Sequence, residues 1–346
     1  MFLYLPSNVD KNDITGKDIE KFNPVTFPSR SDTRLGRLIL SPALSMCRYI
    51  YDDIDLYFSF QHPILPSSIK SIMLIYDIRF LLQASTYRSY RRLFLKTVIP
   101  TSLNIAKHVI TISQDTKQDI VDLLKLDDSK VSVVYPGVHE MFEVLDKDDE
   151  RYLSAKAFLA DRGVEQPFMF YVGNTEPRKN LERLVRSLPI LYSALSRKVQ
   201  LVIAGGQYYY NRRSLLQTVQ ELQLQDQVIF TDIIDDDLLV GLYNLASLHV
   251  LPSTHEGFGM TLLESMACGT PIVTSTAGSL PEVAGEAAVL VNPYSIDSIA
   301  EGLYYVLSSN ERADQLRKVG LTRMKLFTWE KTANNVVRIF KSVLEQ

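Results

Sequence analysis

Residues 248–273 read LHVLPSTHEGFGMTLLESMACGTPIV, a pattern that predicts a strand, a glycine-rich turn, a helix and a second strand. Gly257 and Gly259 stand where the chain must turn sharply and expose backbone N–H groups at the start of the helix. Free N–H groups and the positive end of the helix dipole together favour a phosphate group. Glu256 and Glu264 lie on either side of this turn. Carboxylates beside a phosphate site are costly unless a ligand needs them, and sugar hydroxyls donate hydrogen bonds to carboxylates.

Short apolar runs alternate with helix-like stretches along most of the chain. The runs predicted as strands are FLYLP (2–6), DLYFSF (55–60), SIMLIYD (71–77), HVITIS (108–113), VSVVYPG (131–137), FMFYV (168–172), VQLVIAGG (199–206), QVIFTD (227–232), LHVLPS (248–253), PIVTS (271–275) and AAVLV (287–291). Helices are expected over 37–51, 86–107 and 114–126, and from Leu181, Ser214, Asp236 and Met260. The fold class is therefore α/β, with parallel sheets covered by helices. Two such runs predict two Rossmann-like domains that face one another across a ligand-binding cleft.

The predicted domain boundary lies in a charged stretch, residues 138–166, that contains no clear apolar strand. We expect a first domain over 1–150, a second over 151–330, and a C-terminal helix, 331–346, that packs back toward the first domain. Residues 7–35 lack periodicity and predict a loop, and SLPEVAG (279–285) predicts a short turn.

Composition excludes several classes of protein. The chain has 346 residues, 46% of them apolar, and a formal net charge of −3, so bulk charge argues against a nucleic-acid or membrane binder. Cys47 and Cys268 are too few for a disulfide framework or a metal cluster. No secretory signal opens the sequence and no run of about 18 apolar residues occurs, which predicts a soluble, cytoplasmic protein.

Several motifs resemble, in the same order, those of the family-4 glycosyltransferases (glycosyl transferases group 1). They are ITISQDTKQDIVDLL (110–124), VYPGV (134–138), GNTEPRKNLERLV (173–185), LVIAGG (201–206), the 248–273 stretch and SLPEVAGEAAVLVNP (279–293). The resemblance covers roughly residues 70–340, and the EPRKN form looks most like the mannosyl- and rhamnosyl-type members. It implies a GT-B fold and a retaining transfer of a hexose from a nucleotide diphosphate sugar to a glycan or lipid-linked acceptor. It also implies catalysis without a metal ion or other cofactor.

The resemblance assigns roles to the residues of the glycine-rich turn. Glu264 would bind the ribose hydroxyls of the nucleotide sugar, and Glu256 would hydrogen-bond the transferred hexose. Backbone N–H groups of the turn would face the diphosphate and the hexose; they belong to Gly257, Phe258, Gly259, Met260 and Thr261. Preorganised donors aimed at the departing diphosphate would lower the barrier to transfer. Considered alone, the two carboxylates are equally well explained as solvated charges near a helix start.

Arg178 and Lys179 follow a predicted strand in a proline-containing turn. This cationic pair can neutralise the departing diphosphate, with Arg178 forking two oxygens and Lys179 acting as a point charge. Many family members carry an arginine where Asn174 stands here, so the charge of the diphosphate would rest on Arg178 and Lys179 alone. The alternative interpretation is a surface pair that caps the following helix.

The nucleobase is expected near the ends of VQLVIAGG and QVIFTD, where Gly205 allows close approach of the backbone. Asp232 stands where the family commonly has a glycine. Residues 208–210 are tyrosines and are followed by two arginines, at 212 and 213. They could stack on a ligand, but we favour an amphipathic loop edge. The run Asp235, Asp236 and Asp237 is expected to cap a helix rather than to hold a metal.

The first domain departs from the family pattern in two ways. No glycine-rich loop follows FLYLP, so its sheet is expected to be short by an N-terminal strand, either because the chain start is truncated or because the element is lost. Tyr76 and Asp77, the acceptor-side candidates, stand where relatives often have His-Asp. A tyrosine titrates near pH ~10 and replaces an imidazole poorly in proton transfer. The alternative function is therefore a catalytically weak nucleotide-sugar-binding homologue that acts as partner of an active glycosyltransferase.

The basic stretch over residues 86–107 sets Arg88, Arg91, Arg92 and Lys96 among apolar side chains. A basic amphipathic helix could rest on an anionic membrane at the inner face, where lipid-linked acceptors occur. We favour an ordinary domain helix with one solvated face, since Pro100 is expected to interrupt the helix.

Overall fold

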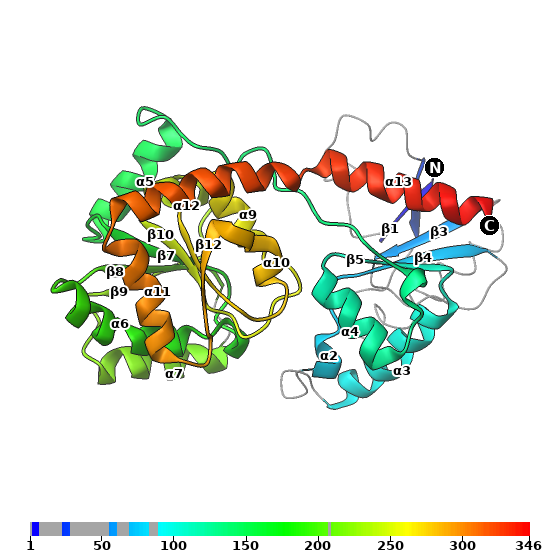
Figure 1. Ribbon diagram of the computed structural model, residues 1–346, viewed down its shortest axis with the longest axis horizontal. Coiled ribbons are helices and arrows are strands. Elements are labelled where there is room, and N and C mark those ends of the chain that lie inside the picture. Colours follow the sequence, from blue (N-terminus) through cyan, green and yellow to red (C-terminus); the bar gives the residue numbers. More distant parts are fainter. Residues whose placement is uncertain (1, 7–22, 28–54, 61–68, 83–88, 207–208) are drawn as a thin grey trace. The chain divides into compact units, whose positions relative to one another are not determined.

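The computed structural model describes residues 2–6, 23–27, 55–60, 69–82, 89–206 and 209–346 (Figure 1). Its contacts divide the chain into two compact units. Unit 1 comprises Met1–Thr111, Lys117–Ser132 and Val337–Gln346, and unit 2 comprises Ile112–Thr116 and Val133–Val336. The expected helix at 37–51 and the thiol of Cys47 lie outside the described residues.

Unit 2 is built on six parallel strands, in the order β12-β11-β10-β7-β8-β9. The strands are β7 (Phe168–Val172), β8 (Gln200–Ala204), β9 (Val228–Asp232), β10 (Leu248–Leu251), β11 (Ile272–Ser275) and β12 (Ala288–Val291). The α/β prediction is confirmed, and each of these strands lies within a predicted apolar run. Their order is that of the Rossmann fold.

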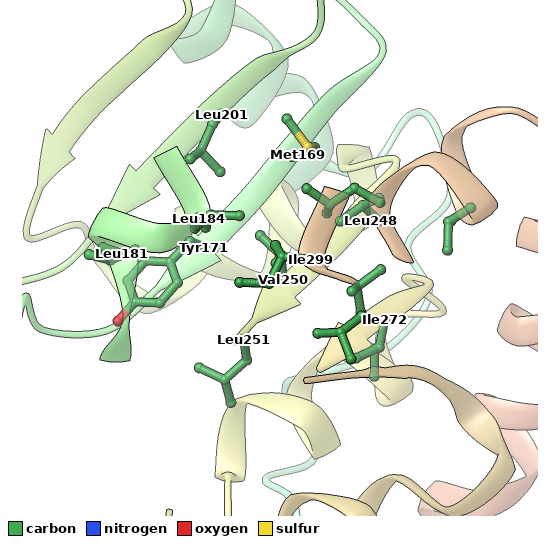
Figure 2. Packing of buried hydrophobic residues seen from close by; sticks show 14 of the residues in the cluster. Met169, Tyr171, Leu181, Leu184, Leu201, Leu248, Val250, Leu251, Ile272 and Ile299 are labelled. Atoms are coloured by element: carbon green, nitrogen blue, oxygen red, sulfur yellow. The ribbon is translucent and has the colours of Figure 1, made fainter. Parts of the chain in front are cut away.

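Both faces of this sheet are covered by helices. They are α5 (Glu150–Asp161), α6 (Leu181–Leu195), α7 (Tyr209–Glu221), α8 (Asp236–Leu245), α9 (Met260–Ala267), α10 (Leu280–Ala284), α11 (Ile296–Leu307) and α12 (Asn310–Arg323). Met169 and Tyr171 of β7 point into the core beneath α6 and α11 (Figure 2). The alternate residues of β7, Phe168 and Phe170, pack with α5 and α8 on the other face. This period of two is what a strand buried on both faces requires.

The sheet has one topological switch point, between β7 and β10. From β7 the chain builds outward through β8 and β9, and then returns to the other side of β7 with β10. The loops that follow β7 and β10 therefore leave adjacent strand ends, and the chain then continues to β8 on one side and to β11 on the other. Ligands of open α/β sheets bind at the carboxyl ends of the strands beside such a point.

Two helices of unit 2 and the boundary between the units differ from what the sequence predicts. SLPEVAG is not a turn, because Leu280–Ala284 form the short helix α10, whose Leu280 and Val283 are fully buried. Helix α7 begins at Tyr209, five residues before the expected start at Ser214, which makes Tyr209 and Tyr210 helical rather than a loop edge. The contact boundary falls near residue 132 instead of 150, since α5 packs on α8, with Gly241 against the Arg151 carbonyl.

Unit 1 contains a four-stranded sheet, ordered β3-β4-β5-β6, in which β3, β4 and β5 are parallel, and a separate parallel pair, β1-β2. The strands are β1 (Phe2–Pro6), β2 (Asn23–Phe27), β3 (Leu56–Phe60), β4 (Lys70–Ile75), β5 (His108–Thr111) and β6 (Val131–Val133). Strand β2 corrects the prediction of a loop over 7–35. Its Val-Thr-Phe residues favour strand structure, and pairing with β1 outweighs the Asn-Pro start.

The described residues of unit 1 include helices α2 (Arg79–Leu82) and α3 (Ser89–Ile105) and most of α4 (Gln114–Leu124). Helix α3 runs through Pro100, so the predicted interruption is wrong; tertiary packing of Ile99 and Leu103 keeps the helix continuous. Arg88 lies outside the described residues. Lys96 is solvent-exposed on α3. Among the described residues, no helix is both long and apolar enough to cross a membrane.

The C-terminal helix α13 (Trp329–Glu345) begins in unit 2 and ends in unit 1. Within unit 1 the Phe340 ring packs edge-on against Phe58, with 5.0 Å between centroids. The Leu344 carbonyl accepts a hydrogen bond from Lys70 Nζ at 2.7 Å. The last turns of the helix therefore pack on the edge strand β3 and beside the start of β4.

Gly205 follows the end of β8, where backbone conformation and close packing both require a glycine. Its φ is +128°, and a Cβ there would collide with the backbone of Gly173. Gly205→Ala is therefore expected to lower the free energy of unfolding by about 2–3 kcal/mol, measured by chemical denaturation. Gly206→Ala is the matched control, because a Cβ at Gly206 meets no atom within 4 Å. Equal losses in the two variants would contradict the prediction.

Candidate functional site

The loops after β7 and β10 are tied together at the switch point. The Thr254 N–H donates to the Arg178 carbonyl at 2.7 Å. The Asn180 side chain donates to the carbonyls of Pro252 and Pro293, at 3.0 and 2.6 Å. Asn180 is 4% exposed and has a left-handed backbone, which asparagine tolerates better than most residues. Segments more than 70 residues apart in sequence thus form one small structure.

This structure brings the three predicted catalytic residues into contact. Arg178 Nη1 lies 2.5 Å from Glu256 Oε2, and Lys179 Nζ lies 2.6 Å from Glu256 Oε1. Ser253, which the sequence analysis did not single out, donates its hydroxyl to Oε1 at 2.8 Å. Glu256 is only 7% exposed, so the alternative interpretation, a solvated charge near a helix start, does not describe this carboxylate.

The charges of this cluster balance. Arg178 also pairs through Nε with Glu176 Oε2 at 2.7 Å, so two carboxylates face two cations. Burial by itself would raise the pKa of Glu256, but Lys179 and Arg178 outweigh it and hold that pKa below its ordinary value. Burial would likewise lower the pKa of Arg178, but Glu256 and Glu176 keep it above the ordinary value. Glu256 and Arg178 are therefore ionised at neutral pH.

Lys179 differs from Arg178 in this respect. Burial lowers the pKa of its ammonium group, and the attraction of Glu256 offsets that effect only in part. The side chain is 11% exposed and touches a single carboxylate, whereas Arg178 touches two. Lys179 therefore gives up fewer ion pairs than Arg178 when it moves to bind another anion, and the free-energy cost is lower.

The glycine-rich turn leads directly into α9. Gly259 is the N-cap residue with a φ of +94°, and no side chain among the described residues caps this helix start. The buried Phe258 ring holds the turn in place by packing against Phe327 and Tyr135, with centroids 5.9 and 6.1 Å away. Met260 and Thr261 form the first turn of α9. The first N–H groups of a helix have no intrahelical acceptor, so this turn offers donors for an anion.

Glu264 lies in the second turn of α9, where the Tyr243 hydroxyl donates to its Oε2 at 2.9 Å. Burial raises the pKa of Glu264, and the hydrogen bond from Tyr243 only partly counters it. Among the described residues, no lysine or arginine pairs with Glu264, in contrast to Glu256. Tyr243 comes from α8. It was not predictable as a site residue, because a tyrosine in an apolar helical stretch has the pattern of an ordinary core residue.

The raised pKa of Glu264 has a consequence for stability. A carboxyl group whose pKa is raised in the folded state favours folding below its unfolded pKa and loses that contribution as pH rises through the folded pKa. Glu264→Gln, which keeps an acceptor for Tyr243, is therefore expected to be about 1 kcal/mol more stable than the unmodified protein at pH 7.5. The gain should shrink toward pH 4.5. Thermal melts at both pH values measure it, and a gain that grows on acidification would contradict the expectation.

His249 of β10 supports the same turn of α9. It is fully buried, and burial lowers the pKa of its imidazole to about 3, so the ring is neutral. Nδ1 lies 3.1 Å from the Phe170 carbonyl, which can only accept, so Nδ1 carries the proton. Nε2 then accepts from the Thr261 hydroxyl at 3.4 Å. The neutral ring thereby connects β7 to the start of α9.

The expected nucleobase region lies at the ends of β8 and β9. The Gly205 N–H donates to the Asp232 carbonyl at 2.7 Å, and Asp232 has a left-handed backbone with a φ of +60°. Its carboxylate pairs with Arg212 at 3.1 Å. Tyr208 lies outside the described residues. Asp235 accepts the Leu238 N–H at 2.8 Å as the N-cap of α8, which confirms the expected cap.

The acceptor-side candidates belong to unit 1 and follow the end of β4. Asp77 accepts hydrogen bonds from the backbone N–H and Nε of Arg79, at 3.0 and 2.8 Å, at the start of α2. Tyr76 is 41% exposed. Neither residue belongs to the cluster around Glu256 within unit 2.

Comparison with known proteins agrees with this fold. Residues 158–323 match the model of the glycosyl transferases group 1 family. The chain is 28% identical over 280 residues to a serotype-specific mannosyltransferase WbdA of Escherichia coli, covering 80% of this chain and 34% of that protein. It is 25% identical over 294 residues to the O-antigen chain mannosyltransferase B of Escherichia coli, covering 85% and 74%. The chain spans about a third of the length of the WbdA proteins.

Solved structures with the same fold include two that superpose on most of the chain. Sucrose-phosphate synthase from Thermosynechococcus elongatus superposes with a TM-score of 0.74 at 23% identity, over 93% of this chain and 82% of that one. Anabaena HepE in complex with UDP and glucose superposes with a TM-score of 0.71 at 17% identity, over 92% and 86%. The fold is GT-B. Residues 158–323 are thus similar to the group 1 glycosyltransferases.

Proposed function

We propose that this protein transfers a hexose from a nucleotide diphosphate sugar to a glycan or lipid-linked acceptor, with retention at the anomeric carbon. The observation that carries the proposal is the buried Arg178–Glu256–Lys179 cluster at the switch point, adjoining the uncapped start of α9. Mannose is the favoured hexose, because relatives that cover most of this chain are named mannosyltransferases.

The geometry supports a division of labour in the donor site. Cleavage of the anomeric C–O bond leaves negative charge on the diphosphate, and Arg178, Lys179 and the first N–H groups of α9 are the donors placed to stabilise it. Because both cations are paired with Glu256 without a ligand, diphosphate binding would draw them partly away. Glu256 would then be released to accept a hydrogen bond from a hexose hydroxyl, and Glu264 would accept those of the ribose.

We infer that transfer requires no metal ion, since the two protein cations beside Glu256 could themselves neutralise the diphosphate. In the same proposal, the protein acts in the cytoplasm. A lipid-linked acceptor would bring it to the inner membrane face as a peripheral protein. Flotation with anionic vesicles, compared with neutral ones, tests that last element.

The alternative is a nucleotide-sugar-binding homologue that pairs with an active glycosyltransferase and transfers poorly. Tyr76 favours it, because a tyrosine stands where relatives often carry a histidine. This candidate predicts binding of the donor without turnover.

One experiment separates the two candidates. The purified protein is incubated with GDP-mannose, UDP-glucose, UDP-galactose and dTDP-rhamnose, with and without glycan and lipid-linked acceptors, in EDTA. Release of nucleoside diphosphate and the thermal shift are measured together. Acceptor-dependent release supports the transferase, and a thermal shift without release supports the binding homologue. Neither signal with any donor would overturn both.

A further inference from the structure

A tyrosine outside the expected donor-binding set contacts that set directly. The Tyr243 side chain, from α8, is fully buried, and its hydroxyl lies 2.9 Å from Glu264 Oε2 and 3.4 Å from the Thr261 carbonyl. One hydroxyl thus bridges the first turn of α9 and the carboxylate in its second turn. A buried hydroxyl must have a partner, and a hydroxyl that donates to a carboxylate makes one of the stronger hydrogen bonds.

The position of that hydroxyl is rigid. The Tyr243 ring packs edge-on against Phe170, His249 and Phe142, with centroids 5.2, 5.4 and 6.1 Å away. These residues come from β7, β10 and the segment before α5, so three separate parts of unit 2 fix the ring. Burial also holds the pKa of the Tyr243 hydroxyl well above its ordinary value, which keeps it a donor.

A donor fixed on Oε2 determines how Glu264 can bind a ligand. The carboxylate has about four lone-pair directions, and Tyr243 occupies one of them on Oε2. Its rotation is restricted, and the remaining lone pairs keep a fixed direction. A carboxylate held in one orientation can accept from two vicinal hydroxyls at a lower entropic cost than one that rotates freely.

We propose that Tyr243 is a positioning residue, which holds the Glu264 carboxylate in the orientation that accepts both ribose hydroxyls of the donor nucleotide. The proposal rests on the function proposed above, in which Glu264 binds the ribose. It adds that the preference for ribonucleotides over deoxynucleotides depends on a side chain that does not touch the ligand.

Tyr243→Phe tests the proposal, because phenylalanine keeps the ring packing and removes only the hydroxyl. Dissociation constants are measured by calorimetry for GDP, UDP and their 2′-deoxy and 3′-deoxy analogues. In the unmodified protein we expect the ribonucleotide to bind about 10-fold or more tightly than the deoxy analogues. In Tyr243→Phe this ratio should fall by about 3–10-fold, with binding of the deoxy analogues nearly unchanged.

The matched control is Tyr192→Phe. The Tyr192 hydroxyl donates to the Val199 carbonyl at 2.8 Å, beside the start of β8 and therefore at the opposite end of the strands from the site. The Tyr192→Phe variant also loses a tyrosine hydroxyl that donates a hydrogen bond, but to a neutral carbonyl, so it should lose some stability and keep the ribose preference. A Tyr243→Phe variant that weakens all six nucleotides equally, or keeps the full ratio, overturns the positioning role.

Glu264→Ala separates failure of this inference from failure of the proposed function. If Glu264→Ala removes the ribose preference while Tyr243→Phe retains it, Glu264 binds the ribose and the role of Tyr243 is wrong. If Glu264→Ala leaves the preference intact, the donor site itself is misassigned. If the ribose preference falls in both Glu264→Ala and Tyr243→Phe, and Tyr192→Phe keeps it, both proposals are supported.

Discussion

Lys179→Ala is expected to lower the rate of sugar transfer by about 10²–10³-fold, with a smaller effect on donor binding. The ammonium group is one of two protein cations at the switch point, held 2.6 Å from Glu256. Removing one preorganised donor from a developing oxyanion costs roughly this factor in other enzymes. The loss should fall mainly on kcat, because the charge on the diphosphate grows as the anomeric bond breaks.

Steady-state kinetics with the active donor measure this effect, and a surface variant provides the comparison. Lys198→Ala removes an exposed lysine just before β8, at the opposite end of the strands, and should retain full activity. Lys179→Arg should recover part of the rate, because the charge is kept while the geometry changes. A Lys179→Ala enzyme with the kcat of the unmodified protein would remove Lys179 from the site.

Glu256→Ala is expected to produce the largest loss of stability, about 3–5 kcal/mol in the free energy of unfolding. The substitution leaves Arg178 and Lys179 buried, with 11% of each side chain exposed, and takes away the carboxylate that both contact. Glu176 still pairs with Arg178, so the uncompensated charge falls mainly on Lys179. Chemical denaturation at pH 7 measures the loss.

The dependence on pH gives this prediction a second readout. Lys179 and Arg178 hold the pKa of Glu256 below its ordinary value, against the effect of burial. The ionised carboxylate therefore favours folding above its unfolded pKa, and that contribution is lost as pH falls through the lower, folded pKa. The gap between Glu256→Ala and the unmodified protein should narrow in acid.

A matched carboxylate separates burial from simple loss of charge. Glu182 pairs with Arg186 at 3.0 Å on the exposed surface of α6, with half of its side chain exposed. Glu182→Ala should change stability by about 0.5 kcal/mol or less. Comparable losses in the two variants would show that burial of the Glu256 cluster contributes nothing.

Much of the fold was predictable from local patterns. The strand FMFYV, the turn through Gly259 and the helix from Met260 each depend on neighbours in sequence, through hydrophobic period and turn chemistry. The cap by Asp235 was predictable for the same reason. Strand β2 was not, because its Asn-Pro start suggests a loop and pairing with a distant strand overrides that preference.

By itself, the sequence determined that the protein is α/β, that a glycine-rich turn starts α9, and that Glu256, Glu264, Arg178 and Lys179 are the residues to examine. Only the tertiary structure decided that the loops after β7 and β10 meet, that Glu256 pairs with both cations, and that the Tyr243 hydroxyl donates to Glu264. The reason is physical. Local patterns depend on residues a few positions apart, whereas strand order and side-chain pairing depend on how the whole sheet and its helices bury their apolar faces.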